Sequence, residues 1–173
     1  MHAKKSLGQN FLNSKAVARD IARAAEIAST DTVLEIGPGK GFLTGELLAS
    51  GARVIAVEKD DRMIPLLSEK FADEITRGQF TLIHGDILKF DPKSYHLKAN
   101  SYKLIANIPY YLTGHIIRTF LETEVKPERM ILMVQKEVAT RIVARDKKES
   151  ILSIAVKAYG TPKLIKKVPA RYF

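Results

Sequence analysis

The chain has 173 residues, the length of a single domain, and its 46% hydrophobic and 27% charged residues are typical of a water-soluble globular protein. The composition excludes disulfide bonds and thiolate metal sites because cysteine is absent, and no apolar run approaches the ~20 residues of a membrane-spanning helix. Lys and Arg outnumber Asp and Glu by 28 to 19, a net charge of +9 that favours either a polyanionic partner or simple solubility.

Predicted strands alternate with predicted helices along most of the chain. In order, the pattern gives a loop at 4–13, a helix at 14–28, a strand at 32–36, a helix to about 50, a strand at 53–57, a helix at 60–71, strands at 80–84 and 102–106, a helix at 113–122, a strand at 129–134 and a helix to about 145. The apolar segments 151–159 and 163–168, separated by Gly160-Thr161-Pro162, predict a hairpin. We therefore expect a doubly wound α/β fold, with a mostly parallel seven-stranded sheet, helices on both faces and a terminal antiparallel hairpin.

A glycine-rich segment, Glu-Ile-Gly-Pro-Gly-Lys-Gly at residues 35–41, lies between the first predicted strand and its helix. Gly37 and Gly39 allow a sharp turn and let a ligand approach the peptide groups without a Cβ in the way. The spacing G-x-G-x-G departs from the dinucleotide pattern G-x-G-x-x-G, and the absence of Gly-Lys-Ser/Thr excludes a P-loop. Mononucleotide and methyl-donor sites use similar turns, so the loop alone leaves the ligand open.

Two acidic residues follow the next two predicted strands. Glu58 is placed where a carboxylate can accept both hydroxyls of a ribose, and Asp86 is placed where a carboxylate can accept the amino group of adenine. Either acid alone is equally well explained as a helix N-cap. Glycine loop, Glu58 and Asp86 in this order together predict an adenosine site at the carboxyl edge of a sheet.

The tetrapeptide Asn107-Ile108-Pro109-Tyr110 follows the fourth predicted strand. A lone N-x-P would indicate only a loop, but beside an adenosine site it suits methylation of an exocyclic adenine amine. The Asn107 side-chain oxygen and the Ile108 carbonyl can hold the two amine hydrogens, while Pro109 stiffens the turn. Tyr110 offers a face on which the base can stack.

These motifs together resemble the KsgA/Erm family of ribosomal RNA adenine N6-dimethyltransferases over essentially the whole chain. The resemblance begins at residues 5–12, Lys-Ser-Leu-Gly-Gln-Asn-Phe-Leu, and residues 133–138, Met-Val-Gln-Lys-Glu-Val, are more similar to the KsgA branch than to the Erm branch. It implies S-adenosylmethionine as cofactor and no metal. The donor-binding residues that it implies are Gln9, Asn10, Leu12, Gly37, Gly39, Glu58, Lys59, Asp86, Ile87 and Asn107.

The resemblance also implies a catalytic set and a substrate. The catalytic set is Asn107, Ile108, Pro109, Tyr110 and Phe173, with Phe173 stacking on the face of the adenine opposite Tyr110. The implied reaction is dimethylation of adjacent adenosines in small-subunit ribosomal RNA, within an assembly particle, by a cytoplasmic monomer that does not bind a membrane. In the family a Pro-x-Pro-Lys-Val stretch and a small helical domain follow, so we expect residues 1–173 to be the catalytic domain, without that helical domain.

Two alternative functions remain at this stage. One is an Erm-like activity on large-subunit ribosomal RNA, and the other is a ribosome assembly factor that binds RNA without turnover. All three functions agree with the excess of basic residues after residue 135, and we expect Arg141, Arg145, Lys147 and Lys148 to form part of an RNA-binding face.

Overall fold

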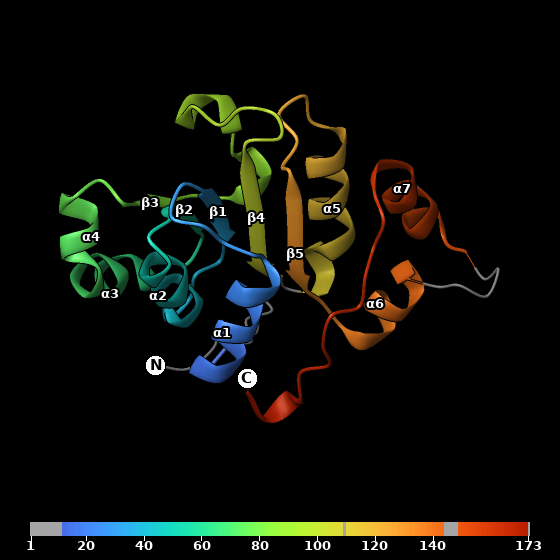
Figure 1. Cartoon of the computed structure of the whole chain (residues 1–173), viewed down its shortest axis with the longest axis horizontal. Helices are drawn as coiled ribbons and strands as arrows, with labels where there is room; N and C mark the ends of the chain where they lie inside the picture. Colours follow the sequence, from blue (N-terminus) through green and yellow to red (C-terminus); the bar gives the residue numbers. More distant parts are fainter. Residues whose placement is uncertain (1–11, 109, 144–148, 173) are drawn as a thin grey trace.

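The computed structural model describes residues 12–108, 110–143 and 149–172, with only the backbone of Tyr110. Its centre is a five-stranded parallel sheet with the order β3-β2-β1-β4-β5 (Figure 1). The strands are β1 (Thr32–Ile36), β2 (Arg53–Glu58), β3 (Phe80–His84), β4 (Tyr102–Asn107) and β5 (Arg129–Met133). All five lie within one residue of their predicted ends, which confirms the α/β fold with a parallel sheet.

Side chains alternate along each strand, and the two faces of the sheet build two separate cores. Val33 and Val54 pack into the first core and Leu34 and Ile55 into the second. Residues of α1 (Lys15–Ala24), α2 (Phe42–Ala49) and α3 (Met63–Lys70) complete the first core. Residues of α5 (Thr113–Glu122) complete the second core. The sheet is therefore covered on both faces, as a doubly wound fold requires (Figure 1).

The remaining elements are short. They are α4 (Ala72–Thr76), α6 (Lys136–Val143), α7 (Ile151–Tyr159) and the 3-10 helices η2 (Ile87–Lys89), η3 (Pro92–Tyr95), η4 (Tyr110–Leu112) and η5 (Ala170–Tyr172). The 3-10 helix η2 begins three residues after the end of β3, and η4 begins three residues after the end of β4. Among the described residues, no helix is both long and apolar enough to cross a membrane.

The predicted terminal hairpin is wrong, because its first strand is a helix. Residues 151–159 form α7, whose N-cap Ser150 accepts a hydrogen bond from the backbone N–H of Ser153 at 3.2 Å. The Ser153 hydroxyl is fully buried and donates to the carbonyl of Ile142 on α6 at 3.2 Å. Capping and packing against α6 therefore override the β-forming tendency of this isoleucine- and valine-rich segment.

The second predicted strand of the hairpin, 163–168, has no regular secondary structure, so over the described residues the sheet has five strands rather than seven. This segment lies along α1 instead. Lys166 forms an ion pair with Asp20 of α1, and Val168 packs against the first core. The carbonyl of Tyr172 accepts a hydrogen bond from the N–H of Asn13 at 2.9 Å, so the described end of the chain is fastened beside α1.

Candidate active site at the carboxyl edge of the sheet

Four neighbouring strands end at one edge of the sheet, and this topology brings the predicted site residues together. The glycine loop follows β1, Glu58 ends β2, Asp86 comes two residues after β3, and Asn107 ends β4. Because the order is β3-β2-β1-β4 and every pair is parallel, all four segments share the carboxyl edge. Neighbouring strands are about 4.8 Å apart, so the row from Asp86 to Asn107 spans roughly 14 Å.

The glycine loop adopts a backbone that other residues rarely allow. Gly37, Gly39 and Gly41 have φ angles of 67°, 56° and 71°, in the left-handed region. The N–H of Gly37 donates to the Val57 carbonyl at 2.9 Å, which ties the start of the loop to β2. A Cβ added at Gly37 would meet nothing within 4 Å, so open space borders the backbone where a ligand is expected to approach.

Glu58 is 5% exposed and its carboxylate organises the turn that surrounds it. Its Oε2 accepts the N–H of Gly39 at 3.0 Å, and its Oε1 accepts the N–H of Asp60 at 2.8 Å. Burial raises the pKa of Glu58, while these backbone hydrogen bonds act in the opposite direction. A carboxylate has about four acceptor sites, more than the three backbone N–H groups that Glu58 binds, so the group retains capacity for a ribose hydroxyl.

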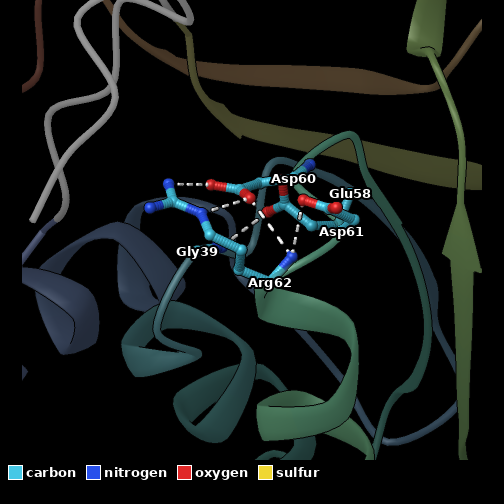
Figure 2. Close-up of polar contacts among 5 residues, drawn as sticks. All are labelled: Gly39, Glu58, Asp60, Asp61 and Arg62. Carbon is cyan, nitrogen blue, oxygen red and sulfur yellow. Dashed lines mark hydrogen bonds and ion pairs between the residues drawn. The ribbon is translucent and has the colours of Figure 1, made fainter. Parts of the chain in front are cut away.

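The turn after Glu58 is held by an ion pair between a buried carboxylate and a partly exposed arginine, which the sequence did not suggest. The Arg62 guanidinium donates two hydrogen bonds to the Asp60 carboxylate, from Nε to Oδ1 at 2.8 Å and from Nη2 to Oδ2 at 2.6 Å (Figure 2). Asp60 is 1% exposed, so this paired contact compensates a charge that would be costly alone. The pair fixes the Asp60 N–H that donates to Glu58. Its only sequence signal is an acid and an arginine two and four residues after the strand-ending glutamate.

Asp86 has the helix N-cap role that the sequence left open for it, and it also forms an ion pair with Lys59. Its Oδ1 accepts the N–H of Leu88 at 3.1 Å as the N-cap of η2, and its Oδ2 accepts Lys59 Nζ at 2.8 Å. The hydrogen bond from Lys59 holds the pKa of Asp86 below its usual range, so the group is an ionised acceptor. Ile87 beside it is buried in the second core.

The Asn107 motif lies on the strand next to the glycine loop. Asn107 is half-buried and pairs in register with Met133 of β5. The N–H of Ile108 donates to the Met133 carbonyl at 3.3 Å, and the Ile108 side chain is 2% exposed within the second core. The backbone of Asn107 and Ile108 is therefore fixed by β5 and by the core, as a positioning role requires.

Several predicted site residues fall elsewhere. Leu12 is buried in the first core. Gln9, Asn10, Pro109 and Phe173 lie outside the described residues, and of Tyr110 only the backbone, which begins η4, is described. Of the predicted basic face, Arg141 is exposed on α6, whereas Arg145, Lys147 and Lys148 lie outside the described residues.

A further tyrosine near this edge was missed by the sequence analysis. Tyr111 is 61% exposed and lies close enough to Lys59 to contribute to the raised pKa of that lysine, whose main cause is the hydrogen bond to Asp86. The doubled tyrosine, Tyr110-Tyr111, is the only sequence signal for this electrostatic interaction.

Comparisons with known proteins agree with this geometry. A family model described as ribosomal RNA adenine dimethylase matches residues 1–173. The ribosomal RNA small subunit methyltransferase A of Dehalococcoides mccartyi (strain CBDB1) is 48% identical over 173 residues, which are 100% of this chain and 58% of the relative. The chain thus spans less than two thirds of the length of the curated relatives that it matches first.

Two solved structures share the fold. A dimethyladenosine transferase from Plasmodium falciparum is 32% identical, with a TM-score of 0.72 over 86% of this chain and 52% of that chain. The 23S rRNA methyltransferase ErmE is 27% identical, with a TM-score of 0.71 over 84% of this chain and 56% of that chain. These matches confirm the resemblance drawn from the motifs: the chain belongs to the ribosomal RNA adenine dimethylase family.

Proposed function

We propose that this chain is the catalytic part of an S-adenosylmethionine-dependent enzyme that dimethylates adenine N6 in small-subunit ribosomal RNA. The observation that carries the proposal is the shared carboxyl edge, where Glu58, Asp86 and the glycine loop lie on three neighbouring strands and Asn107 lies on the fourth. A substrate in small-subunit RNA is favoured by the 48% identity to a relative named for that substrate, against 27% identity to the 23S enzyme.

The residues at this edge fit the adenosine of the donor. Glu58 is an acceptor fixed beneath the glycine loop, and Asp86 is an ionised acceptor one strand away, which suit ribose hydroxyls and an adenine amino group respectively. Lys59 now occupies Asp86 Oδ2, so it shares or yields this oxygen when adenine binds. The open space beside Gly37 leaves room for the methionine part of S-adenosylmethionine to extend toward β4.

The chemistry demanded of the protein is mainly alignment. When bound, S-adenosylmethionine supplies an electrophilic methyl group on a sulfonium that leaves as a neutral thioether. Asn107 Oδ1 and the Ile108 carbonyl would accept the two hydrogens of the adenine amine and leave its lone pair free to face the donor. Methyl transfer would leave the C–S electron pair on the thioether, and the proton lost by the amine would pass to water. Because β5 fixes the backbone of both residues, little reorganisation is needed.

The test is methyl transfer with the position of the product determined. The chain is incubated with S-adenosylmethionine labelled in its methyl group and with small-subunit or large-subunit particles that lack the modification. We expect dimethyladenosine at two adjacent positions of the small-subunit RNA only. We expect Asn107→Ala to lower the rate at least ~100-fold, since a positioned hydrogen-bond partner of the transition state contributes about that much.

The matched control is Asn100→Gly, at the opposite end of β4, where glycine keeps the positive φ of 57°. This variant should retain the parent rate. Transfer only to large-subunit RNA would replace the proposal by the Erm-like alternative. Binding of particles without any transfer would replace it by the assembly-factor alternative, and an unchanged rate in Asn107→Ala would refute the assigned mechanism.

A further inference from the structure

Lys70, the last residue of α3, reaches back to the glycine loop. Its ammonium donates to the carbonyl of Lys40 at 2.8 Å and to the carbonyl of Gly41 at 3.2 Å. The same Nζ lies 5.4 Å from the centroid of the Phe42 ring and 5.1 Å from that of Phe71. Two hydrogen bonds and two cation–π contacts thus fasten one side chain to the loop and to its surroundings.

Lys70 is exposed as a residue, yet its ammonium lies against the loop at a position that is electrostatically unfavourable. Gly41 is the N-cap of α2, and the N-terminus of a helix carries a partial positive charge that repels a cation. Desolvation lowers the pKa of Lys70, as does the nearby charge of Lys15, whereas Glu35 acts in the opposite direction. An unconstrained lysine at the end of α3 would extend into water. The contacts with the loop must offset these costs.

The loop also packs tightly on the final turn of α3. Gly41 has a φ of 71°, and a Cβ added there would lie 2.6 Å from Cε2 of Phe71 and 2.9 Å from Cδ2 of Leu67. Lys70 binds the carbonyls on this side of the loop, and Glu58 binds the N–H of Gly39 on the other side. The loop is therefore held between the last turn of α3 and the end of β2.

We infer that Lys70 is a positioning residue of the donor site: its grip on the Lys40 and Gly41 carbonyls holds the glycine loop in the conformation that receives the donor. The inference rests on the proposed function, because it takes the loop as part of the donor site. Lys70 acts through the loop backbone and makes no contact with the reacting atoms.

The test compares Lys70→Met, Lys70→Arg and Lys98→Met by calorimetric titration with S-adenosylmethionine. Met forms helices about as well as Lys, so α3 is not weakened by the first change. We expect Lys70→Met to raise the Kd at least ~10-fold, through loss of hydrogen bonds from a charged donor. Lys70→Arg keeps a cation with N–H donors that can also lie over the Phe42 and Phe71 rings, so its Kd should stay within about threefold of the parent. Lys98 is exposed before β4, and its variant should bind like the parent.

Two further readouts separate positioning from general stability. With RNA substrate, Lys70→Met should raise the KM for the donor and leave kcat nearly unchanged. Without any ligand, amide hydrogen exchange at Gly39 and Gly41 should accelerate at least fivefold in Lys70→Met and not in Lys98→Met. A parent chain that binds no donor would refute the proposed function alone, and the exchange rates would still test the inference. If Lys70→Met keeps both the donor Kd and the amide hydrogen exchange rates of the parent, Lys70 is not a positioning residue of the loop.

Discussion

Glu35, the first residue of the glycine-rich segment 35–41, has a buried carboxyl group with a strongly raised pKa. It is 1% exposed on β1, and over the described structure its Oε2 has no hydrogen-bond partner. Burial raises the pKa of Glu35 to about 8, with a further contribution from the charge of Glu58, against a lowering by the Thr44 hydroxyl. Glu35 is therefore mainly neutral at pH 7, beneath a site whose other acids act as acceptors.

This shift predicts a pH-dependent stability. A carboxyl whose pKa is raised on folding contributes stability that is complete below its ordinary pKa of 4.5 and is lost as the pH rises to about 8. Glu35→Gln imitates the neutral form, so its free energy of unfolding should exceed that of the parent by a few kcal/mol, on the order of 1.4 kcal/mol per pKa unit, at pH 8.5. At pH 4.5 the two proteins should be similar.

Urea unfolding of parent, Glu35→Gln and the surface control Glu69→Gln between pH 4.5 and 8.5 measures this difference. Glu69 is exposed on α3, so its variant should follow the parent at every pH. If the parent and Glu35→Gln curves run parallel over the whole range, Glu35 does not titrate as its burial implies.

At the scale of elements, the two ends of β4 have separate tasks. Near the amino end, Lys103 Nζ donates to the Glu26 carbonyl and to Asp31 Oδ2, both at 2.7 Å, and its side chain is 8% exposed. Asn107 lies at the carboxyl end, the edge that forms the candidate site. Four residues of strand place these ends roughly 13 Å apart. One end therefore fastens the loop between α1 and β1 to the sheet, and the other lies at the candidate site.

This separation predicts that stability and ligand binding respond independently. Lys103→Met should lower the free energy of unfolding by about 2–4 kcal/mol, because it leaves Asp31 without its buried partner. The donor Kd should stay within twofold of the parent. Urea unfolding and calorimetry on the same preparation measure both quantities, and the double variant Lys103→Met/Asp31→Asn should recover part of the loss. A donor Kd that changes together with stability would show that the two ends are coupled.

The sequence predicted the parallel sheet well because each strand is a short apolar run between turn residues. The strands at 32–36 and 80–84 have the predicted bounds. The sequence failed at 151–159, where the run Ile-Leu-Ser-Ile-Ala-Val suits either a strand or a helix. The capping by Ser150 and the bond from Ser153 to α6 decide for the helix, and the latter is visible only in the folded chain.

The candidate site was predictable wherever topology alone dictates it. Once a parallel sheet is inferred, residues at the ends of its strands must share one edge, which is why Glu58, Asp86 and Asn107 could be placed together. Lys70 was not predictable, because its contact with the loop joins residues about 30 positions apart through side-chain packing. The bidentate ion pair between Arg62 and Asp60 was missed because, in the sequence, the two residues look like ordinary charged surface residues.

At the scale of the whole molecule, some basic side chains form ion pairs with acidic residues, whereas others are exposed to solvent. Lys157 pairs with Glu149 and Lys166 with Asp20, so part of the basic excess toward the C-terminus holds the fold. Lys136 and Arg141 are exposed on α6, which begins three residues after Met133, the partner of Asn107 in the sheet. Two exposed cationic residues therefore lie on the helix that follows the carboxyl end of β5, in the part of the chain that the structure describes.

The central claim is that the carboxyl edge of this sheet holds the adenosine of a methyl donor. The most direct measurement is a crystal structure of the chain with S-adenosylhomocysteine. We predict that the ribose hydroxyls lie on Glu58, that the adenine amino group lies on Asp86 with Lys59 displaced or shared, and that the sulfur points toward Asn107. A ligand bound elsewhere, or bound at this edge without contact to either Glu58 or Asp86, would contradict the account.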